Sequence, residues 1–390
     1  MTIDSAQSYR FGDWGVEDSY QSLVDRGASP DLLSKVWVAN HYRLIVWKVA
    51  CYTRSWPQHF ATETALCFSP AVVMDQLIYR YEREINRAER PALRKIVEGD
   101  EAAAKHMVLC IASIVDEYSE QSKQNVLSVT VTDGWYVLPA ALDACLTRAV
   151  KRGKLKVGSK IHVCRAKLTG AENGVAILEL AGAGSSTSSV SMILQANSTR
   201  LARWDAKLGF QRAPLIWTTR LRNITPEGGL VPGLDVIVLR KYPVMYMETL
   251  EDGTTKLKRT AKEEECASEA HREKVQKRYQ DMVQEVEREF GTERDSGRMR
   301  EEVQARAVEL QAEIAARNIT PFFTIRVGNY GSGTRYNGHG DGGRHQEALV
   351  TFWQADHTPY QEGRRVRVSE IAICRSSCVV CKDLRSMEAC

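Results

Sequence analysis

An aromatic pair and an arginine pair late in the chain are the residues best suited to binding chemistry. Phe352 and Trp353 are adjacent in a run of strand-forming residues, so one ring faces the core and the other faces outward. Arg365 and Arg367 alternate with valines in the next such run and therefore share a face. An outward aromatic ring stacks on a nucleic-acid base, and arginines beside it neutralise phosphates. The alternative is an aromatic ring that caps a barrel end beside solvated arginines, and the pattern leaves both interpretations open.

Two other groups of side chains have the types, but not the context, of metal ligands. A glycine-rich loop over residues 331–345 carries His339, Asp341 and His345, yet it lacks the lysine and the helix start of a phosphate-binding loop. Four cysteines near the C-terminal end have a spacing that is not standard for zinc: Cys374, Cys378, Cys381 and Cys390. We expect no metal at either place, and unpaired thiols in an irregular Cys-rich tail over residues 376–390.

Composition and motif content exclude several classes of protein. No Ser/His/Asp, Cys/His or paired-carboxylate arrangement stands out, so we expect neither an enzyme nor a bound cofactor. The 390 residues have 43% hydrophobic content, which is enough for several domains with real cores. The sequence has no apolar run of about 18 residues that would span a membrane. Ten scattered cysteines favour a reducing cytosol or nucleus over a disulfide framework.

The net charge of +4 is unevenly distributed along the chain. Residues 261–317 hold 11 Lys/Arg and 15 Asp/Glu, whereas the rest of the chain holds 42 and 34. The body is therefore basic and this segment is acidic. Such a distribution fits a polyanionic partner for the body alone, although many basic proteins never bind nucleic acid.

A β-barrel between residues 105 and 212 is the clearest predicted domain. Segments rich in β-branched residues alternate with turn signals such as Asp133-Gly134, and a short helix over residues 141–153 ends at Gly153. The predicted strands are residues 106–115, 126–132, 135–142, 160–168 and 189–196. Three strands, a helix and two further strands are the order of a five-stranded OB fold, which commonly binds single-stranded nucleic acid or oligosaccharide.

A helical domain is predicted before this barrel, over residues 31–104, after a loose polar lead-in over residues 1–30. Asp31 or Ser34 is suited to cap the first helix, and Ser69-Pro70 opens a second one. The aromatic residues of the first helix recur at helical spacing, so we expect them to be core rather than functional: Trp37, His41 and Trp47.

A second barrel is predicted over residues 213–260 and 319–375, interrupted by residues 261–318. Within the interruption the apolar residues change from strand spacing to helical spacing, with a break near residues 291–297, which indicates an antiparallel hairpin of two helices. The expected fold is therefore an α+β multidomain chain: an α-helical domain followed by two OB-fold β-barrels, the second interrupted by a long antiparallel helical hairpin.

A series of arginines follows the second predicted helix and could form a basic face. Its members include Arg80, Arg83, Arg87, Arg90 and Arg94. Solvated helix faces often have this composition. The functional alternative is a docking face for an acidic chain, since guanidinium groups bind carboxylates in a bidentate manner.

Several long segments carry a resemblance to a known family. TDGWY (residues 132–136) and ANSTRLARWDAKLGF (residues 196–210) resemble the DNA-binding domain of the type 2 breast-cancer-susceptibility protein family. Residues 37–50 and 77–111 are similar to its helical domain, and residues 233–248 and 322–330 to its interrupted second OB fold. The resemblance extends in order from about residue 37 to about residue 375.

The resemblance implies specific partners and departures from the family pattern. A small acidic protein, shared with the proteasome lid, is expected on the helical domain and first barrel, at Arg80, Arg83, Arg87, Arg94 and Trp135. The family carries a long helical tower in the second barrel, and the short turn between the two helices here implies a shortened one. We expect the closing strand after residue 375, the third OB fold and the recombinase-binding repeats to be missing, with a RecA-like recombinase bound through regions outside this chain.

The implied function is a nuclear, non-catalytic module for single-stranded DNA in double-strand break repair by homologous recombination, supporting recombinase loading. With the first barrel occupied by the acidic partner, the DNA ligands are expected on the second barrel: Arg240, Lys241, Lys256, Lys258, Trp353, Arg365 and Arg367. The alternative is a protein-interaction scaffold for the acidic partner with weak or lost DNA binding, and an RNA-binding OB module is a third possibility.

Overall fold

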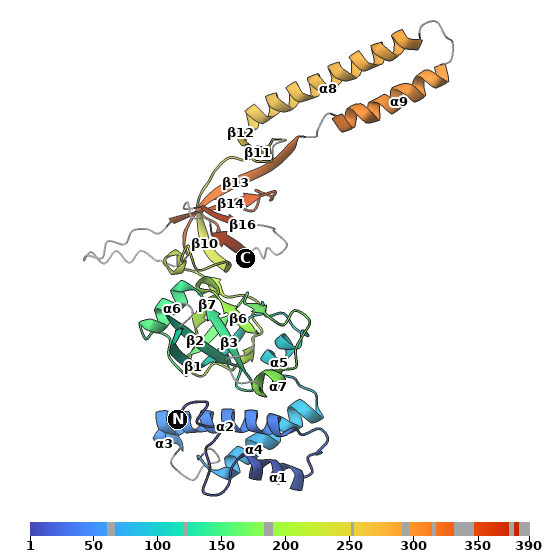
Figure 1. The fold of residues 1–390 in the computed structure, drawn as a ribbon. Coiled ribbons are helices and arrows are strands. Elements are labelled where there is room, and N and C mark those ends of the chain that lie inside the picture. Colours follow the sequence, from blue (N-terminus) through green and yellow to red (C-terminus); the bar gives the residue numbers. More distant parts are fainter. Residues whose placement is uncertain are drawn as a thin grey trace, which may run out of the picture. The chain divides into compact units, whose positions relative to one another are not determined.

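The computed structural model describes residues 1–60, 67–119, 124–182, 190–250, 253–290, 296–313, 317–330, 347–373 and 378–381. The chain divides into two compact units (Figure 1). The first comprises residues 1–218 and 222–233, and the second comprises residues 219–221 and 234–390. In the described part of the chain, no helix combines the length and the apolar character that a membrane span requires.

The N-terminal part of the first unit is helical. Its elements are α1 (Val16–Asp25), α2 (Lys35–Ser55), α3 (Pro57–Phe60), α4 (Pro70–Tyr81), a π-helical turn η1 (Glu82–Asn86) and α5 (Ala92–Val97). The Ser34 side chain accepts a hydrogen bond from Trp37 N at 3.1 Å, which confirms the predicted cap of α2. Trp37, His41 and Trp47 are all buried, as expected for core residues.

The expectation of a loose lead-in over residues 1–30 is wrong. Residues 16–25 form α1, and Ile3, Ala6 and Leu23 are buried in the helical core. Trp14 packs on Tyr42 of α2 with ring centroids 5.8 Å apart. The apolar residues of this segment are too few to show a period, and they are buried only because α2 and α4 supply the rest of the core.

The first barrel follows in the same unit. Its elements are β1 (Met107–Ser119), β2 (Gln124–Thr132), β3 (Val137–Leu142), α6 (Ala144–Lys151), β4 (Lys160–Val163), β5 (Lys167–Thr169), α7 (Ile177–Gly182), β6 (Ser191–Leu194), β7 (Thr199–Leu201) and β8 (Gly209–Phe210). The strand order is β5-β6-β3-β2-β1-β4-β7, with β8 beside β1. β3 and β6 are parallel, whereas β1 pairs antiparallel with both β2 and β4. This arrangement agrees with the predicted OB fold.

Two details differ from the prediction for the first barrel. The expected single strand over residues 160–168 is split into β4 and β5, because Arg165 between them has a positive φ of 55° that turns the chain. Helix α5, assigned by sequence to the helical domain, contributes Leu93, Ile96 and Val97 to the barrel core instead. The domain boundary therefore lies before α5 rather than at residue 105.

The second unit is built around another barrel. Its strands are β10 (Val231–Lys241), β11 (Met245–Thr249), β12 (Lys256–Thr260), β13 (Asn318–Asn329), β14 (Glu347–Trp353), β15 (Arg365–Ile373) and β16 (Cys378–Cys381). They lie in the order β12-β11-β13-β14-β16-β15-β10, and an additional pairing of β10 with β13 closes the ring. Its core holds Phe323, Phe352 and Tyr360.

β16 corrects the expectation that the closing strand is missing and that residues 376–390 are irregular. It pairs in parallel with β14 and antiparallel with β15, so it joins the two strands and completes the barrel. Residues 382–390, and the side chains of all four cysteines that were expected to be unpaired thiols, lie outside the described part.

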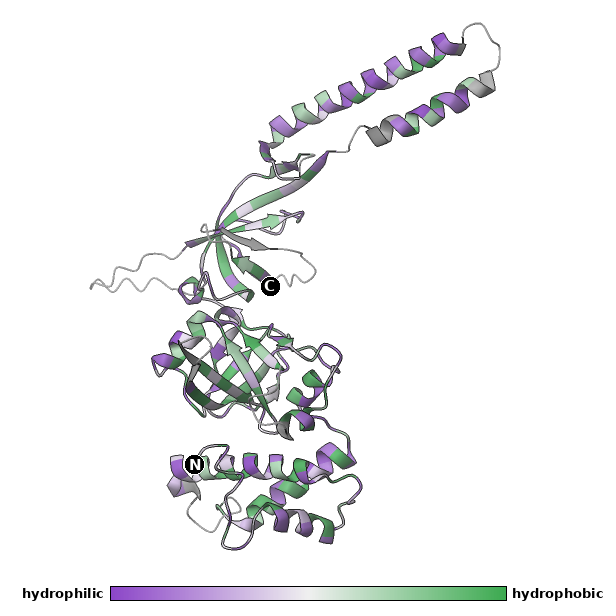
Figure 2. Cartoon of the chain, in the orientation of Figure 1, coloured by the Kyte–Doolittle hydropathy of each residue, from purple (hydrophilic) through white to green (hydrophobic). Residues whose placement is uncertain are grey.

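Two helices stand between β12 and β13, as predicted for the interruption: α8 (Ala261–Phe290) and α9 (Ser296–Glu313). Both are largely hydrophilic along their length (Figure 2). α9 packs against α8, where Met282 and Val286 are buried, and Arg306 binds Glu289 at 2.6 Å. The correspondence of this pair to the family's tower stays a prediction.

A buried ion network lies where α8 leaves the barrel. Glu248 of β11 binds Arg259 and Arg317, and Glu264 of α8 binds the same two arginines. Both carboxylates are almost fully buried. The guanidinium of Arg317 lowers the pKa of Glu248 to about 2. Strand, helix and returning chain are therefore held together by charge at the base of the helical pair.

Candidate nucleic-acid and partner interfaces

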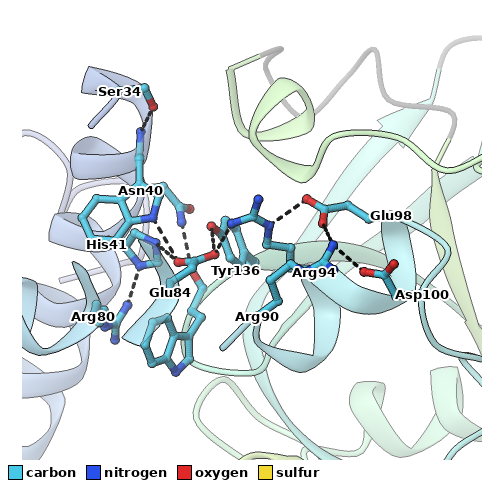
Figure 3. A network of polar contacts seen from close by, with 12 residues as sticks. Ser34, Asn40, His41, Arg80, Glu84, Arg90, Arg94, Glu98, Asp100 and Tyr136 are labelled. Atoms are coloured by element: carbon cyan, nitrogen blue, oxygen red, sulfur yellow. Dashed lines mark hydrogen bonds and ion pairs between the residues drawn. The ribbon is translucent and has the colours of Figure 1, made fainter. Parts of the chain in front are cut away.

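A buried carboxylate, Glu84, joins the helical domain to the first barrel. It accepts hydrogen bonds from Trp37 Nε1 at 3.0 Å and from the Tyr136 hydroxyl at 2.6 Å, and it binds Arg94 at 2.8 Å (Figure 3). These three partners come from α2, from the turn that precedes β3, and from α5. Because Glu84 needs all three segments in place, it fixes the packing of the helical domain on the barrel.

His41 extends this network on the side of α2. Arg80 can only donate and lies 2.9 Å from His41 Nδ1, so Nδ1 accepts and the proton is carried by Nε2. Nε2 lies 3.2 Å from Glu84 Oε2. Burial lowers the pKa of His41 to about 4, so its imidazole is neutral near pH 7. The pKa of Glu84 is held at about 2 by hydrogen bonds from His41, Tyr136 and Arg94, which outweigh the cost of its burial.

The turn that carries Trp135 is fixed by a second buried carboxylate. Asp133 accepts hydrogen bonds from the backbone N–H groups of Leu93, Trp135 and Tyr136, at 2.8, 2.9 and 3.0 Å. Asn40 of α2 donates to the Trp135 carbonyl at 2.9 Å. Asp133 and Asn40 thus hold the backbone of Trp135 from two sides. Its half-buried ring lies at the junction between α4 and the barrel.

Arginines and aromatic rings surround Trp135. The guanidinium groups of Arg80 and Arg83 lie 5.0 and 6.0 Å from its ring centroid. Arg83 also lies 5.5 Å from the ring of Tyr79, which is itself partly exposed. The structure thus brings together Arg80, Arg83 and Trp135 of the predicted partner site, and it adds Tyr79, which the sequence analysis missed.

The predicted basic face needs correction, because each of its arginines already has a partner within the chain. Arg83 binds Glu89, Arg87 binds Glu82, and Arg90 binds Glu98 and Asp100. Arg94 is shared by Glu84 and Glu98. Arg80 is 4% exposed and hydrogen-bonded to His41, so it presents no charge to a docking chain. An acidic partner would have to displace or join these carboxylates.

On the second barrel, Trp353 is the outward member of its aromatic pair. Phe352 is in the core, whereas Trp353 is partly exposed and packs on Phe322 with ring centroids 4.8 Å apart. Lys258 of β12 lies 5.3 Å from the Phe322 ring. The strand register from β12 through β11 and β13 to β14 places Lys256, Lys258 and Trp353 on one face of the sheet.

A second cluster lies beside the C-terminal end of β13, where Tyr330 follows the strand and meets residues of β10 and β15. Arg365 binds the buried Asp235 through two bonds of 2.7 and 2.6 Å, and Arg367 binds it at 3.2 Å. The Arg365 guanidinium also covers the Tyr330 ring at 3.9 Å. Arg365, followed by Arg367, lowers the pKa of Asp235. Arg365 and Arg367 lie together as predicted, but they are held by a carboxylate that the sequence analysis did not assign.

The remaining predicted DNA ligands lie on opposite faces of β10. Arg240 pairs with Arg326 in the strand register, and its guanidinium is exposed beside the Tyr242 ring at 5.4 Å. Lys241 pairs with the core residue Ile325, and its ammonium donates to the His357 carbonyl at 2.6 Å. Arg240 therefore belongs with the outward face, and Lys241 does not.

The side chains of both groups that were considered as metal ligands, and for which no metal is expected, lie outside the described part of the chain. The loop with His339, Asp341 and His345 is outside it, as are the side chains of the C-terminal cysteines. Among the described residues, no group of three or more His, Cys, Asp or Glu side chains is arranged to hold a metal ion.

The chain is similar to two curated proteins of Arabidopsis thaliana. Protein BREAST CANCER SUSCEPTIBILITY 2 homolog A is 37% identical over 250 residues and homolog B is 36% identical over the same length. Each alignment covers 60% of this chain and 20% of the relative, so the aligned part of the chain spans a fifth of those proteins. A solved structure, the crystal structure of p204 HINb domain, covers 73% of this chain and 96% of its own at 8% identity, but its TM-score of 0.17 carries no argument.

Two family models match adjacent parts of the chain. The model described as BRCA2, helical, matches residues 9–88, and the model described as BRCA2, oligonucleotide/oligosaccharide-binding, domain 1, matches residues 91–212. The first begins within residues 1–30, the segment that was expected to be a loose lead-in, and the second begins just before α5, which packs in the barrel core. Together they match more than half of the chain, in the order of the two structural domains, and the chain therefore belongs to the BRCA2 family.

Proposed function

We propose that this chain is a non-catalytic, nuclear module that binds single-stranded DNA in double-strand break repair by homologous recombination and supports the loading of a RecA-like recombinase. The observation that carries the proposal is the consecutive match of the helical and oligonucleotide/oligosaccharide-binding models of one family over residues 9–212. The recombinase contacts are proposed to lie in regions outside this chain.

The second barrel supplies the proposed DNA face. Its outward surface along β13 carries two clusters, one of Trp353, Phe322 and Lys258 and one of Tyr330, Arg365 and Arg367. Phe322 lies in this strand and Tyr330 directly follows its last residue. The two positions are eight residues apart, or about 26 Å at ~3.3 Å per residue for an extended chain. Aromatic rings that stack on bases, separated by cations that neutralise phosphates, are what non-specific single-strand binding requires. The two clusters can therefore contact one DNA strand at two points.

The arginine cluster is proposed to bind phosphate while it remains bound to Asp235. A guanidinium is a planar fork of N–H donors that suits an oxyanion, and Asp235 holds both forks in a fixed orientation. The carboxylate fixes the direction of both side chains, which lowers the entropy lost when a phosphate is bound. It also reduces the net positive charge, so each arginine contributes less to affinity than a free one would.

A direct test is competition for a fluorescent oligo-dT measured by anisotropy. Unlabelled oligo-dT should displace the probe at much lower concentration than a blunt duplex of equal length, because stacking needs exposed base faces. Equal competition by the duplex would show that the chain binds only the charged phosphate backbone of DNA, and that outcome would contradict the proposal. Oligo-U in the same assay distinguishes the RNA-binding alternative.

A protein-interaction scaffold is the second candidate function, and the Trp135 cluster favours it. Trp135, Tyr79 and Arg83 form a partly exposed aromatic and cationic surface on a backbone held by Asp133. We propose that the small acidic protein implied by the family binds there, against Arg83, Arg87 and Arg94. The charge reversal of Arg83 and Arg87 should abolish co-purification with it, whereas Arg203→Glu on an exposed turn of the same unit should not. Arg94 is left unchanged in this test because it binds the buried Glu84.

A further inference from the structure

An aromatic surface on the first unit is not used by either proposed site. Trp204 is 66% exposed, more than any other tryptophan of the described chain, and its ring lies 4.9 Å from that of Trp56. Trp56 in turn lies 5.8 Å from Tyr52, and Lys48 lies 6.0 Å from the Tyr52 ring. We call Lys48, Tyr52, Trp56 and Trp204 the aromatic ledge.

Two elements far apart in sequence build the ledge. Lys48, Tyr52 and Trp56 recur every four residues along α2 and its C-terminal cap, so they follow one helical face. The Trp56 N–H donates to the Tyr52 carbonyl at 2.9 Å, which continues the helical path to the last ring. Trp204 lies in the turn that follows β7 of the barrel. The ledge is thus a helix face extended by one ring from the barrel.

The turn that carries Trp204 is anchored rather than loose. Ala202 N donates to the Lys160 carbonyl at 2.9 Å, and the Lys160 ammonium donates to the Ala206 carbonyl at 2.6 Å. Both ends of the turn are therefore tied to β4. A large exposed ring on a fixed backbone loses little conformational entropy when a planar ligand stacks on it.

The charge around the ledge favours an anion. The Lys48 side chain is exposed to solvent over part of its surface. Burial of the rest lowers its pKa, and the positive charges of Arg80 and Lys160 lower it further. Among the described residues, no carboxylate forms an ion pair with Lys48. The one acidic residue of the Trp204 turn, Asp205, is neutralised by Arg203 through contacts of 3.0 and 2.9 Å.

We propose that the aromatic ledge is a second binding site for single-stranded DNA, on the first unit, in which bases stack on Trp204 and Trp56 and the backbone passes Lys48. The inference deepens the proposed function and rests on it. Stacked rings with an adjacent unpaired cation match the requirements of a single-strand platform, which is tolerant of base sequence. The site is distinct from the β13 face, because the two lie in different units.

The test compares Trp204→Ala with the parent full-length chain in oligo-dT titrations. Loss of one stacked base should weaken binding at least about fivefold, and Trp204→Phe should recover most of the affinity. Leu32→Ala is the matched control, because Leu32 is 62% exposed in the same unit and should bind as the parent does. Lys48→Gln should make the salt dependence shallower, by about 0.7 in slope for one lost phosphate contact.

Photo-crosslinking gives a readout that does not depend on affinity. Oligo-dT that carries 5-iododeoxyuridine should crosslink to a peptide containing Trp204 or Trp56. If the parent binds oligo-dT, but Trp204→Ala binds equally well and neither peptide crosslinks, the ledge is not a DNA site, while the proposed function stands. An equal loss in Leu32→Ala would also overturn the assignment. If the parent itself fails to bind oligo-dT, the proposed function falls and the inference falls with it.

Discussion

At the scale of single residues, Glu84 shows how one buried charge determines the relation of two domains. Its partners Trp37, Tyr136 and Arg94 come from three segments, and each would lose its hydrogen-bond acceptor if the carboxylate were removed. Breaking a buried ion pair at one side costs several kcal/mol, because the opposite charge remains buried without compensation. The interface is therefore specific as well as stable.

Glu84→Ala should lower the free energy of unfolding by about 3 kcal/mol, measured by chemical denaturation with tryptophan fluorescence. Glu89→Ala provides the control, because Glu89 is a half-exposed carboxylate that binds Arg83 nearby. Surface pairs of this kind contribute at most about 1 kcal/mol. Equal effects of the two substitutions would show that Glu84 does not hold the domains together.

The same network makes stability depend on pH in the acid range. The folded-state pKa of His41, about 4, lies below its ordinary value of 6.5, so between these values the unfolded chain binds more protons. Stability should therefore be constant above pH 6.5 and fall by roughly 3 kcal/mol as the pH decreases to 4. Glu84, with a folded pKa of about 2, adds a further loss below pH 4.5. Denaturation curves from pH 7 to 4 test this, and a flat profile would be inconsistent with a buried neutral His41.

Trp353→Ala should weaken oligo-dT binding about tenfold, since one stacked base is worth roughly 1–3 kcal/mol. Its melting temperature must stay near that of the parent, because part of the ring packs on Phe322. Leu257→Ala is the control, since Leu257 is partly exposed on β12 with its side chain on the opposite face to Lys258. If Trp353→Ala melts and binds oligo-dT as the parent does, Trp353 is not part of the DNA site.

Residue types alone predicted some of these contacts and missed others. Alternation along β14 and β15 correctly grouped Arg365 with Arg367 and placed one aromatic ring outward. The carboxylates that hold the arginines were missed, because Asp235 is 130 residues from Arg365 and Glu84 is 10 from Arg94. Such pairs are formed by tertiary packing and leave no periodic signal.

At the scale of elements, the strands were the most predictable part. A run of β-branched residues between turn residues is a local signal, which can be recognised without knowledge of the tertiary contacts. The N-terminal helix α1 was missed, since ten residues show too few apolar positions to define a period. The closing strand β16 was missed as well. Its four residues become a strand only because β14 and β15 leave a gap for them.

The helical pair α8 and α9 should be dispensable for folding if its basal ion network is kept. Replacing residues 269–313 with a short Gly/Ser linker retains Glu264 and Arg317 and should leave a soluble protein with a cooperative melt near that of the parent. Replacing residues 261–317 removes both and leaves the buried Glu248 with Arg259 alone, so this variant should melt at lower temperature. Insolubility of the first variant would contradict the insertion architecture.

At the scale of the whole molecule, the first unit matches the family models and carries the proposed partner site and the aromatic ledge, whereas the second carries the β13 face. The basic excess is confined to the body outside residues 261–317.

The affinity of the full chain for oligo-dT as a function of salt concentration distinguishes single-stranded DNA binding from the scaffold function. We expect measurable binding whose logarithm falls linearly with the logarithm of the salt concentration, with a slope of about −0.7 for each phosphate contacted. The variant that combines Arg365→Ala, Arg367→Ala and Asp235→Asn should make the slope shallower by about 0.7 to 1.4, the loss of one to two phosphate contacts. The change at Asp235 avoids leaving a buried carboxylate without its cations. Negligible affinity, or an affinity that salt does not alter, would contradict single-stranded DNA binding and leave the scaffold as the function of this chain.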